Sequence, residues 1–106
     1  AVHALTVASL DAEQRIATFM VEIALRLGRF SGDRVMLTLP MLRSDIAQYL
    51  ALNADTLSRT LTRVKEQGLV SFDGRREVVI PDWHKLCAAT PLATALMAVH
   101  RKGDGG

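Results

Sequence analysis

Apolar residues recur at helical spacing between positions 11 and 27 of the chain. The positions, which follow i, i+3, i+4, i+7, i+8 and i+11, are Ile16, Phe19, Met20, Ile23, Ala24 and Leu27. This spacing predicts a helix that buries one face, and Gly28 directly after the last apolar position predicts its end. We expect residues 29–33 to form a turn, and VMLTL at 35–39 to form a short strand closed by Pro40.

Two shorter amphipathic segments lie in the stretch LRSDIAQYLALNADTLSRTLTRVKEQGLV, residues 42–70. The first is predicted to form a helix over about residues 42–51, with a buried face made of Ile46, Ala47 and Leu50. The second is predicted to begin after Asn53, a favoured N-cap residue, and to end at Gly68. Because so few residues separate the two helices, the pattern is typical of a helix-turn-helix.

A hairpin and further helices are predicted to follow. The segment LVSFDGRREVVI, residues 69–80, places two β-prone runs around Asp73-Gly74, which is a strong hairpin signal. After Pro81 the pattern predicts a short helix, a break at Pro91 and a final helix to about Arg101. The order of elements predicts a mostly α protein with a small β-hairpin wing. This is a winged helix-turn-helix with a three-helix core, a short antiparallel sheet and an extra C-terminal helix.

The second helix of the pair has an apolar face and a polar face, and burial of the apolar face should leave the polar face exposed to solvent. Leu57, Leu61 and Val64 follow the spacing i, i+4, i+7 and are predicted to be buried together. The side of the helix opposite these apolar residues carries Asp55, Arg59, Thr62 and Glu66, and Ser58 and Arg63 lie beside them. In a helix-turn-helix, the N-terminal part of the second helix contacts base edges in the major groove of DNA. The polar face is therefore a candidate DNA-reading surface.

The residue types on this face suit a duplex. Arginine can donate two hydrogen bonds to guanine, and a carboxylate can accept one from cytosine N4. We therefore predict that the helix at 54–67 lies in the major groove, with base contacts from Asp55, Ser58 and Arg59. The wing at 69–80 should lie on the sugar–phosphate backbone of the DNA. The residues predicted to contact that DNA backbone are Arg43, Thr56, Thr62, Arg63, Arg75 and Arg76.

Charge and composition permit this interpretation without demanding it. The formal net charge is +2 and the pI is near 9.1, which allows an anionic partner. Aromatic residues make up 5% of the chain and are scattered, so base stacking on single strands is not expected as the main activity. The lone Cys87 excludes an internal disulfide, and no apolar run is long enough for a membrane span. We expect a cytoplasmic protein.

Three alternatives remain open from the residues alone. Asp55 and Arg59, at i and i+4, could form a solvent-exposed ion pair with no role in recognition. The winged helix could instead serve as a protein–protein interaction module. His84 and Cys87 could be half of a metal site, but no second pair of ligands has suitable spacing, so neither a metal site nor an enzyme is predicted.

The segment LPMLRSDIAQYLALNADTLSRTLTRVKEQGLVSFDGRREVVIPD, residues 39–82, resembles the CRP/FNR superfamily of bacterial transcription regulators. It is most similar to the fumarate-nitrate and nitrogen-fixation regulator branches, whose pattern is close to LPM-[ST]-R-x-D-I-x-x-Y-L-G-L-T-x-E-T-[IV]-S-R-x-L. The resemblance implies sequence-specific binding of double-stranded DNA as a homodimer on a two-fold operator, with RNA polymerase as a candidate partner. It further implies that Arg59 reads guanine, Ser58 contacts the half-site, and Arg43 binds a backbone phosphate.

Three positions depart from the family pattern. Asp55 stands at the place of a glutamate and is one methylene shorter, which affects its reach to a base. Leu42 replaces a Ser or Thr that would cap the first helix, so Thr38 or a backbone group is expected to serve. Ala51 stands where the turn normally has glycine, and a positive φ there would cost on the order of 1 kcal/mol.

The resemblance also implies a domain organisation. Residues 1–10 would be the end of a dimerisation helix, 11–82 the winged-helix DNA-binding domain, 83–102 a C-terminal helical extension and 103–106 a disordered tail. The chain opens with Ala1 in apolar sequence, so we expect a piece of a larger protein. The family's effector-binding sensor domain is not in this chain, and no cofactor is expected within it.

Overall fold

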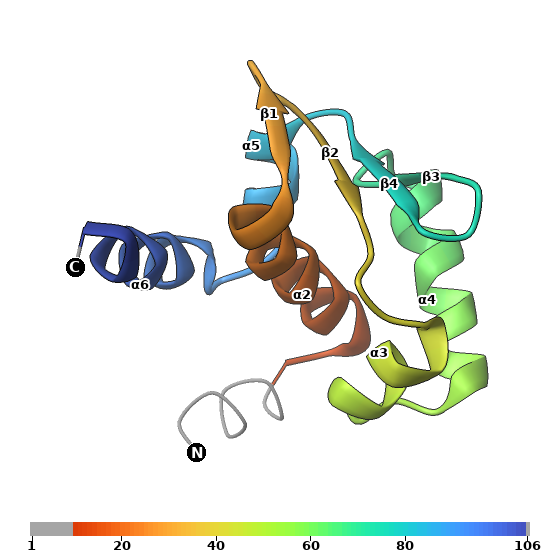
Figure 1. Cartoon of the computed structure of the whole chain (residues 1–106). Helices are drawn as coiled ribbons and strands as arrows, with labels where there is room; N and C mark the ends of the chain where they lie inside the picture. Colours follow the sequence, from red (N-terminus) through yellow and green to blue (C-terminus); the bar gives the residue numbers. More distant parts are fainter. Residues whose placement is uncertain (1–9, 106) are drawn as a thin grey trace.

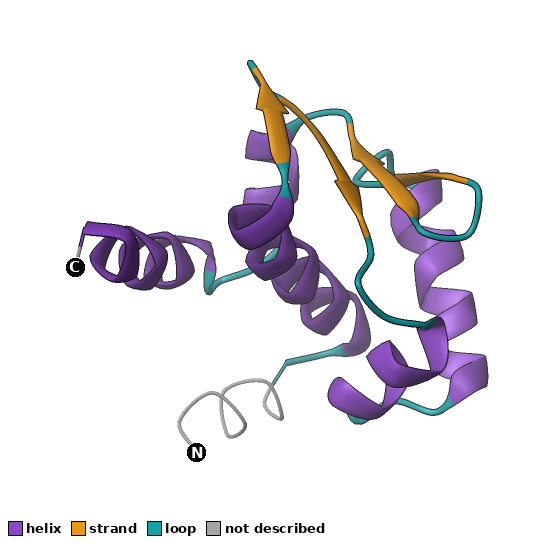
Figure 2. Cartoon of the chain, in the orientation of Figure 1, coloured by secondary structure: helices purple, strands orange, loops and turns teal. Residues whose placement is uncertain are grey.

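The computed structural model describes residues 10–105, and side chains as far as Arg101. Figure 1 shows the order of the elements along the chain, and Figure 2 distinguishes the helices from the strands. The elements are α2 (Ala12–Leu27), β1 (Arg29–Ser31), β2 (Arg34–Thr38), α3 (Arg43–Tyr49), α4 (Ala54–Glu66), β3 (Ser71–Asp73), β4 (Glu77–Ile80), α5 (Trp83–Ala88) and α6 (Ala93–Gly105). The predicted winged helix-turn-helix is confirmed.

The strands form one antiparallel sheet in the order β1-β2-β4-β3. Alternate residues of the central strands point inward and are fully buried, namely Val35, Leu37, Val78 and Ile80. This alternation is expected of a sheet with one face on the core and the other in solvent. The sheet therefore joins the wing, β3–β4, to the segment between α2 and α3.

The predicted turn over residues 29–33 is wrong at its first three positions, which form β1. The strand pairs with β2 in the register Arg29↔Met36, and this pairing satisfies backbone groups that a loop would leave to water. The turn is confined to Gly32 and Asp33, where Gly32 has a φ of 62°. Phe30 of β1 also contacts Trp83 edge-on, with 5.0 Å between ring centroids.

Helix α2 lies at the centre of the domain and is buried on more than one side. Asp11 and Gln14 form a capping box at its start, and the whole run of residues 16–21 is buried. The helix contacts β2, α4, α5 and α6, so most of its circumference is covered (Figure 1). The prediction of a single buried face is therefore wrong, and Leu27, predicted to be buried, is 46% exposed at the last position of the helix.

The helix-turn-helix has the predicted buried faces. Those residues, all nearly inaccessible, are Ile46, Ala47, Leu50, Leu57, Leu61 and Val64. Ala51, in the link between α3 and α4, has a φ of 58°, the left-handed conformation that the missing glycine would favour.

The cap of α3 comes from its own first turn. The carboxylate of Asp45 accepts a hydrogen bond from the backbone N–H of Leu42 at 3.3 Å. Thr38 does not cap the helix, because its hydroxyl donates to Oε1 of Glu77 across the sheet at 2.6 Å. The expectation for Thr38 is therefore wrong.

The C-terminal helices pack on α2. Trp83 and Leu86 of α5 belong to the same hydrophobic core as the winged helix. The hydroxyls of Thr18 and Thr90 are 2.6 Å apart and join α2 to the link before α6.

The ends of the chain only partly match the expectation. Helix α6 continues to Gly105, which is beyond the predicted end near Arg101 and includes the first three residues of the expected tail, 103–105. Gly106 and the expected dimerisation segment before Leu10 lie outside the described residues. Within residues 10–105, none of the helices combines the length and the apolar composition needed to cross a membrane.

Candidate nucleic-acid interface

Helix α4 presents one polar edge at its start. The side chain of Asn53 caps the helix by accepting a hydrogen bond from the backbone N–H of Thr56 at 2.7 Å. The helix buries Leu57, Thr60, Leu61 and Val64 against the domain. Because this packing fixes the rotation of the helix, Asp55, Ser58 and Arg59 are all exposed on the opposite side.

The three predicted base-contacting residues lie together. Asp55, Ser58 and Arg59 line one shallow hollow of about 340 Å³ on the outer side of α4. The Nε atom of Arg59 lies 3.4 Å from the backbone oxygen of Asp55, a long contact. No ion pair joins the two side chains, and within the described residues Arg59 has no carboxylate partner. The alternative of an Asp55–Arg59 ion pair is therefore wrong, and the guanidinium is available to a ligand.

The predicted backbone-contacting residues of α4 border this edge. Thr62 and Arg63 are exposed, whereas Thr56 is half-buried. The hydroxyl of Thr62 donates to the backbone oxygen of Ser58 at 3.1 Å, which leaves its oxygen free to accept but commits its proton. Arg63 forms no ion pair with any described residue.

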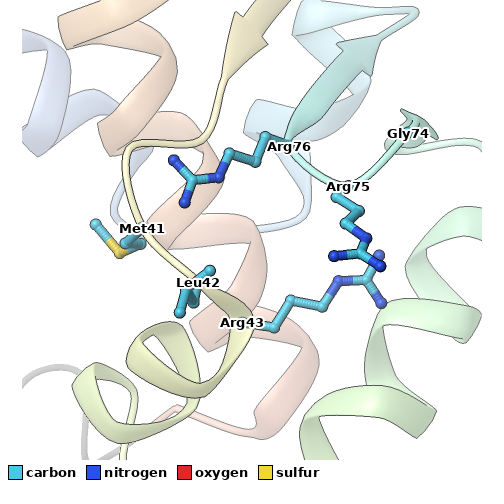
Figure 3. Close-up of a pocket in the computed structure, with 6 residues that line it drawn as sticks. All are labelled: Met41, Leu42, Arg43, Gly74, Arg75 and Arg76. Atoms are coloured by element: carbon cyan, nitrogen blue, oxygen red, sulfur yellow. The ribbon is translucent and has the colours of Figure 1, made fainter.

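The remaining predicted backbone contacts meet in a second hollow, between the start of α3 and the wing. This hollow has a volume of about 470 Å³ and is lined by Met41, Leu42, Arg43, Gly74, Arg75 and Arg76 (Figure 3). The guanidinium groups of Arg43 and Arg75 point toward one another (Figure 3). None of the three arginines forms an ion pair with a described residue. The hollow thus gathers cationic groups that no described residue neutralises.

Phe72 is a residue of this site that the sequence did not reveal. It lies on β3 and is partly buried against the hydrophobic core. The guanidinium carbon of Arg43 lies 4.9 Å from the centroid of its ring, within the range of a cation–π interaction. The contact joins residues far apart in the chain, so no local pattern of sequence could have indicated it.

A second feature missed from the sequence fixes the far end of α4. The Nζ atom of Lys85, on α5, donates a hydrogen bond to the backbone oxygen of Gln67 at 2.7 Å. Gln67 is the C-cap of α4, and its side-chain amide donates to Glu13 of α2 at 3.1 Å. The polar edge of α4 thus belongs to a helix that packs on the core and is hydrogen-bonded at its far end to α2 and α5.

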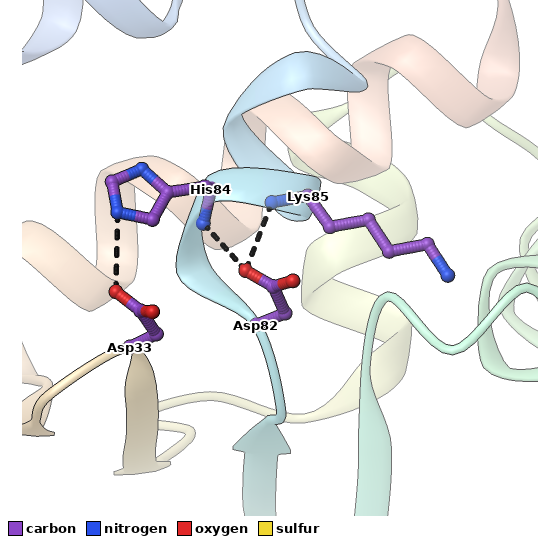
Figure 4. A network of polar contacts seen from close by, with 4 residues as sticks. All are labelled: Asp33, Asp82, His84 and Lys85. Carbon is purple, nitrogen blue, oxygen red and sulfur yellow. Dashed lines mark hydrogen bonds and ion pairs between the residues drawn. The ribbon is translucent and has the colours of Figure 1, made fainter.

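His84 and Cys87 do not gather into a larger cluster. Nε2 of His84 lies 3.1 Å from Oδ1 of Asp33, in the turn between β1 and β2 (Figure 4). Asp82 caps α5 through the backbone N–H groups of His84 and Lys85 (Figure 4). Across the described part of the chain, no group of three or more His, Cys, Asp or Glu residues is arranged to hold a metal ion.

Two groups in the described residues have clearly altered acidity, and neither lies on the polar edge of α4. Burial raises the pKa of the Cys87 thiol. Partial burial, followed by the nearby Glu22 carboxylate, raises the pKa of the Tyr49 phenol. Both shifts favour the neutral form, so neither group adds charge to the protein at pH 7.

The sequence and fold both match known regulators. The family model described as Crp-like helix-turn-helix domain matches residues 14–89. The nitrogen fixation regulation protein FixK of Azorhizobium caulinodans is 38% identical over 81 residues, covering 76% of this chain and 33% of that protein. The transcriptional activator protein anr of Pseudomonas aeruginosa is 40% identical over 77 residues, covering 73% of this chain and 31% of that protein.

Among solved structures, FixK2 of Bradyrhizobium japonicum is similar with a TM-score of 0.70 and 35% identity, covering 83% of this chain and 42% of that one. The chain spans about a third of the length of the curated relatives it matches. The match covers α2, the helix-turn-helix, the wing and α5, in the order described above. The chain therefore belongs to the family of Crp-like helix-turn-helix domains, within the CRP/FNR superfamily.

Proposed function

We propose that this chain binds a specific sequence of double-stranded DNA and thereby regulates transcription. In this proposal α4 lies in the major groove and the wing, β3–β4, lies along the backbone. The observation that carries the proposal is the exposed Arg59 guanidinium, which has no carboxylate partner among the described residues and lines one hollow with Ser58 and Asp55. A helix edge of this kind beside an arginine-lined hollow suits a polyanion that also presents base edges.

Base reading falls to the N-terminal half of α4. The Nε atom of Arg59 donates to the backbone oxygen of Asp55, and its two terminal NH2 groups can donate to the O6 and N7 atoms of a guanine. Ser58, exposed beside it, can donate to or accept from a base. Asp55 would accept from a cytosine amino group, and its short side chain requires the helix to approach that base closely.

Backbone contacts would surround this edge. Thr56, Thr62 and Arg63 border it on α4 itself. Arg43, Arg75 and Arg76 line the hollow between α3 and the wing, where the absence of an ion pair with any described residue favours a phosphate as partner. Such contacts orient the domain on a duplex and carry no sequence information themselves.

The whole protein would act as a homodimer in the cytoplasm. A two-fold dimer places two recognition helices on half-sites about one helical turn apart, so the operator should be a palindrome. RNA polymerase is a candidate partner, since the similar anr protein is described as a transcriptional activator. The effector would bind in a sensor domain outside this chain, so no cofactor is assigned to the residues 1–106.

Selection of binding sites from random duplexes tests the proposal. The bound pool should converge on one half-site sequence that contains a guanine, and affinity for it should fall steeply as salt rises. The same affinity measured on an unrelated duplex gives the specificity ratio. A pool without any sequence preference, together with capture of an acidic protein by the Arg59 edge, would instead favour a protein-binding role.

A further inference from the structure

One of the arginines that line the hollow between α3 and the wing also contacts an aromatic ring of the wing. Arg43 stands at the start of α3, and its guanidinium lies over the ring of Phe72 at 4.9 Å from the centroid. The core and the sheet hold Phe72 in place, because its side chain is partly buried against the core and its backbone pairs with Val78. One side of the ring is thus fixed by the domain while a cation lies over it.

The position of Arg43 is otherwise unfavourable. Its guanidinium points toward that of Arg75 across the hollow, and two like charges repel one another (Figure 3). No described carboxylate forms an ion pair with either guanidinium. The wing residue Glu77 forms its ion pair with Arg29 instead, with 3.7 Å between Oε2 of Glu77 and Nη2 of Arg29. The electron-rich face of Phe72 is the attractive group that the structure shows at Arg43. Without the ring, the long side chain would be expected to move away from Arg75 into solvent.

We propose that Phe72 is a positioning residue for DNA binding, which holds Arg43 over the hollow so that it is already oriented toward a backbone phosphate. The inference rests on the proposed function, since it concerns how that function's phosphate contact is prepared. Immobilising a side chain before binding reduces the rotamer entropy lost on association. Because Phe72 belongs to the wing and Arg43 to α3, the contact also couples the two backbone-contacting elements.

The test is a double-mutant cycle on duplex affinity, with Phe72→Leu and Arg43→Ala. Phe72→Leu should weaken binding to the selected duplex and to an unrelated duplex by the same factor, roughly two- to fivefold. In the Arg43→Ala background the same substitution should change affinity by no measurable factor, because the group that it positions is gone. Phe72→Tyr keeps the aromatic face and should bind as the unsubstituted chain does.

Phe30→Leu is the matched control, since it removes a half-exposed aromatic ring from β1 that contacts Trp83 and not Arg43. It should leave duplex affinity unchanged. Melting temperatures of all variants identify any that unfold, and Phe72→Met, which conserves volume, replaces Phe72→Leu if that variant does not fold.

The inference is overturned if Phe72→Leu costs the same factor with and without Arg43, which is the signature of a purely structural role. It is also overturned if folded Phe72→Leu or Phe72→Met binds as tightly as the unsubstituted chain. In both cases the unsubstituted chain still prefers its selected duplex, and the proposed function stands. If the unsubstituted chain prefers no duplex, the proposed function fails and the inference fails with it.

Discussion

The Nζ atom of Lys85 lies 2.7 Å from the backbone oxygen of Gln67, the C-cap of α4. The last carbonyl groups of a helix lack partners within the helix, and a cation placed there also complements the helix dipole. Through this contact α5 fixes the far end of the helix whose near end carries Arg59. The family match covers α5 as well, so both residues of this contact lie within the matched part of the chain.

We predict that Lys85→Met lowers the free energy of unfolding by about 1 kcal/mol, because one hydrogen bond to the helix end is lost. Urea denaturation followed by circular dichroism measures the change. Lys65→Met is the control, since Lys65 is exposed in the last turn of α4 and its side chain makes no such bond. Equal losses in the two variants would show that the Lys85–Gln67 contact adds no stability.

Arg59→Ala should weaken binding to the selected duplex by about 1–3 kcal/mol and remove discrimination at one base pair. The reason is that a bidentate contact to guanine both stabilises the complex and rejects other bases. Fluorescence anisotropy with the selected duplex and with each single base-pair change measures both effects. Arg59→Lys should retain more affinity than Arg59→Ala, because it keeps the positive charge. If Arg59→Ala instead weakens binding to all duplexes by the same factor, Arg59 does not read a base.

Arg75→Ala should weaken binding to selected and unrelated duplexes about equally. Arg75 lies in the wing hollow, and a phosphate contact made there carries no sequence information. The dependence of affinity on salt should also become shallower, by a slope of about 1. If Arg75→Ala and Arg59→Ala give the same pattern of loss, the division between base reader and backbone clamp is wrong.

The periodicity of apolar residues predicted the helices and the hairpin that make up the site. It could not predict the contacts between residues of the site that are far apart in the sequence. The burial of Leu57, Leu61 and Val64 follows from their spacing, and the exposure of the Arg59 edge follows from that burial. The position of Arg43 over Phe72 depends instead on how the wing folds back onto α3, which no window of sequence contains. The strand at β1 was missed for the same reason, because its pairing with β2 creates it.

The central place of α2 shows the same limit. A single apolar stripe indicates one covering surface, and the sequence could not show that the sheet, α4, α5 and α6 would all pack around this helix. The burial of Thr18 was not predicted, since a threonine is polar. It is buried because its hydroxyl is satisfied by Thr90 and by the backbone oxygen of Gln14.

Cys87 should give a pH-dependent contribution to stability. Burial raises the pKa of its thiol, so the folded state favours the neutral form. The resulting stabilisation is fully present below the unfolded pKa, about 8.5, and is lost as pH rises through the higher folded pKa. The alkylation rate with iodoacetamide should therefore rise at a higher pH in the folded chain than in urea. Coincident pH profiles in the two states would contradict this, and Cys87→Ala provides the baseline without a reactive thiol.

Ala51→Gly should stabilise the chain by about 1 kcal/mol. Ala51 has a φ of 58°, a conformation that costs an alanine free energy through contacts of its Cβ atom and that glycine adopts without this cost. The residue is exposed, so removal of the methyl group leaves no cavity. Thermal unfolding should show a melting temperature higher by roughly 4–8 °C.

The matched control for Ala51→Gly is Ala98→Gly. Ala98 is exposed within α6, where φ is that of a right-handed helix, and glycine there should destabilise by about 1 kcal/mol. The same substitution therefore changes sign between the two positions. Because Ala51 lies in the link between α3 and α4 and does not line the hollow formed by Asp55, Ser58 and Arg59, affinity for the selected duplex should stay unchanged. A lower melting temperature for Ala51→Gly would mean that the left-handed conformation at Ala51 does not strain the helix-turn-helix.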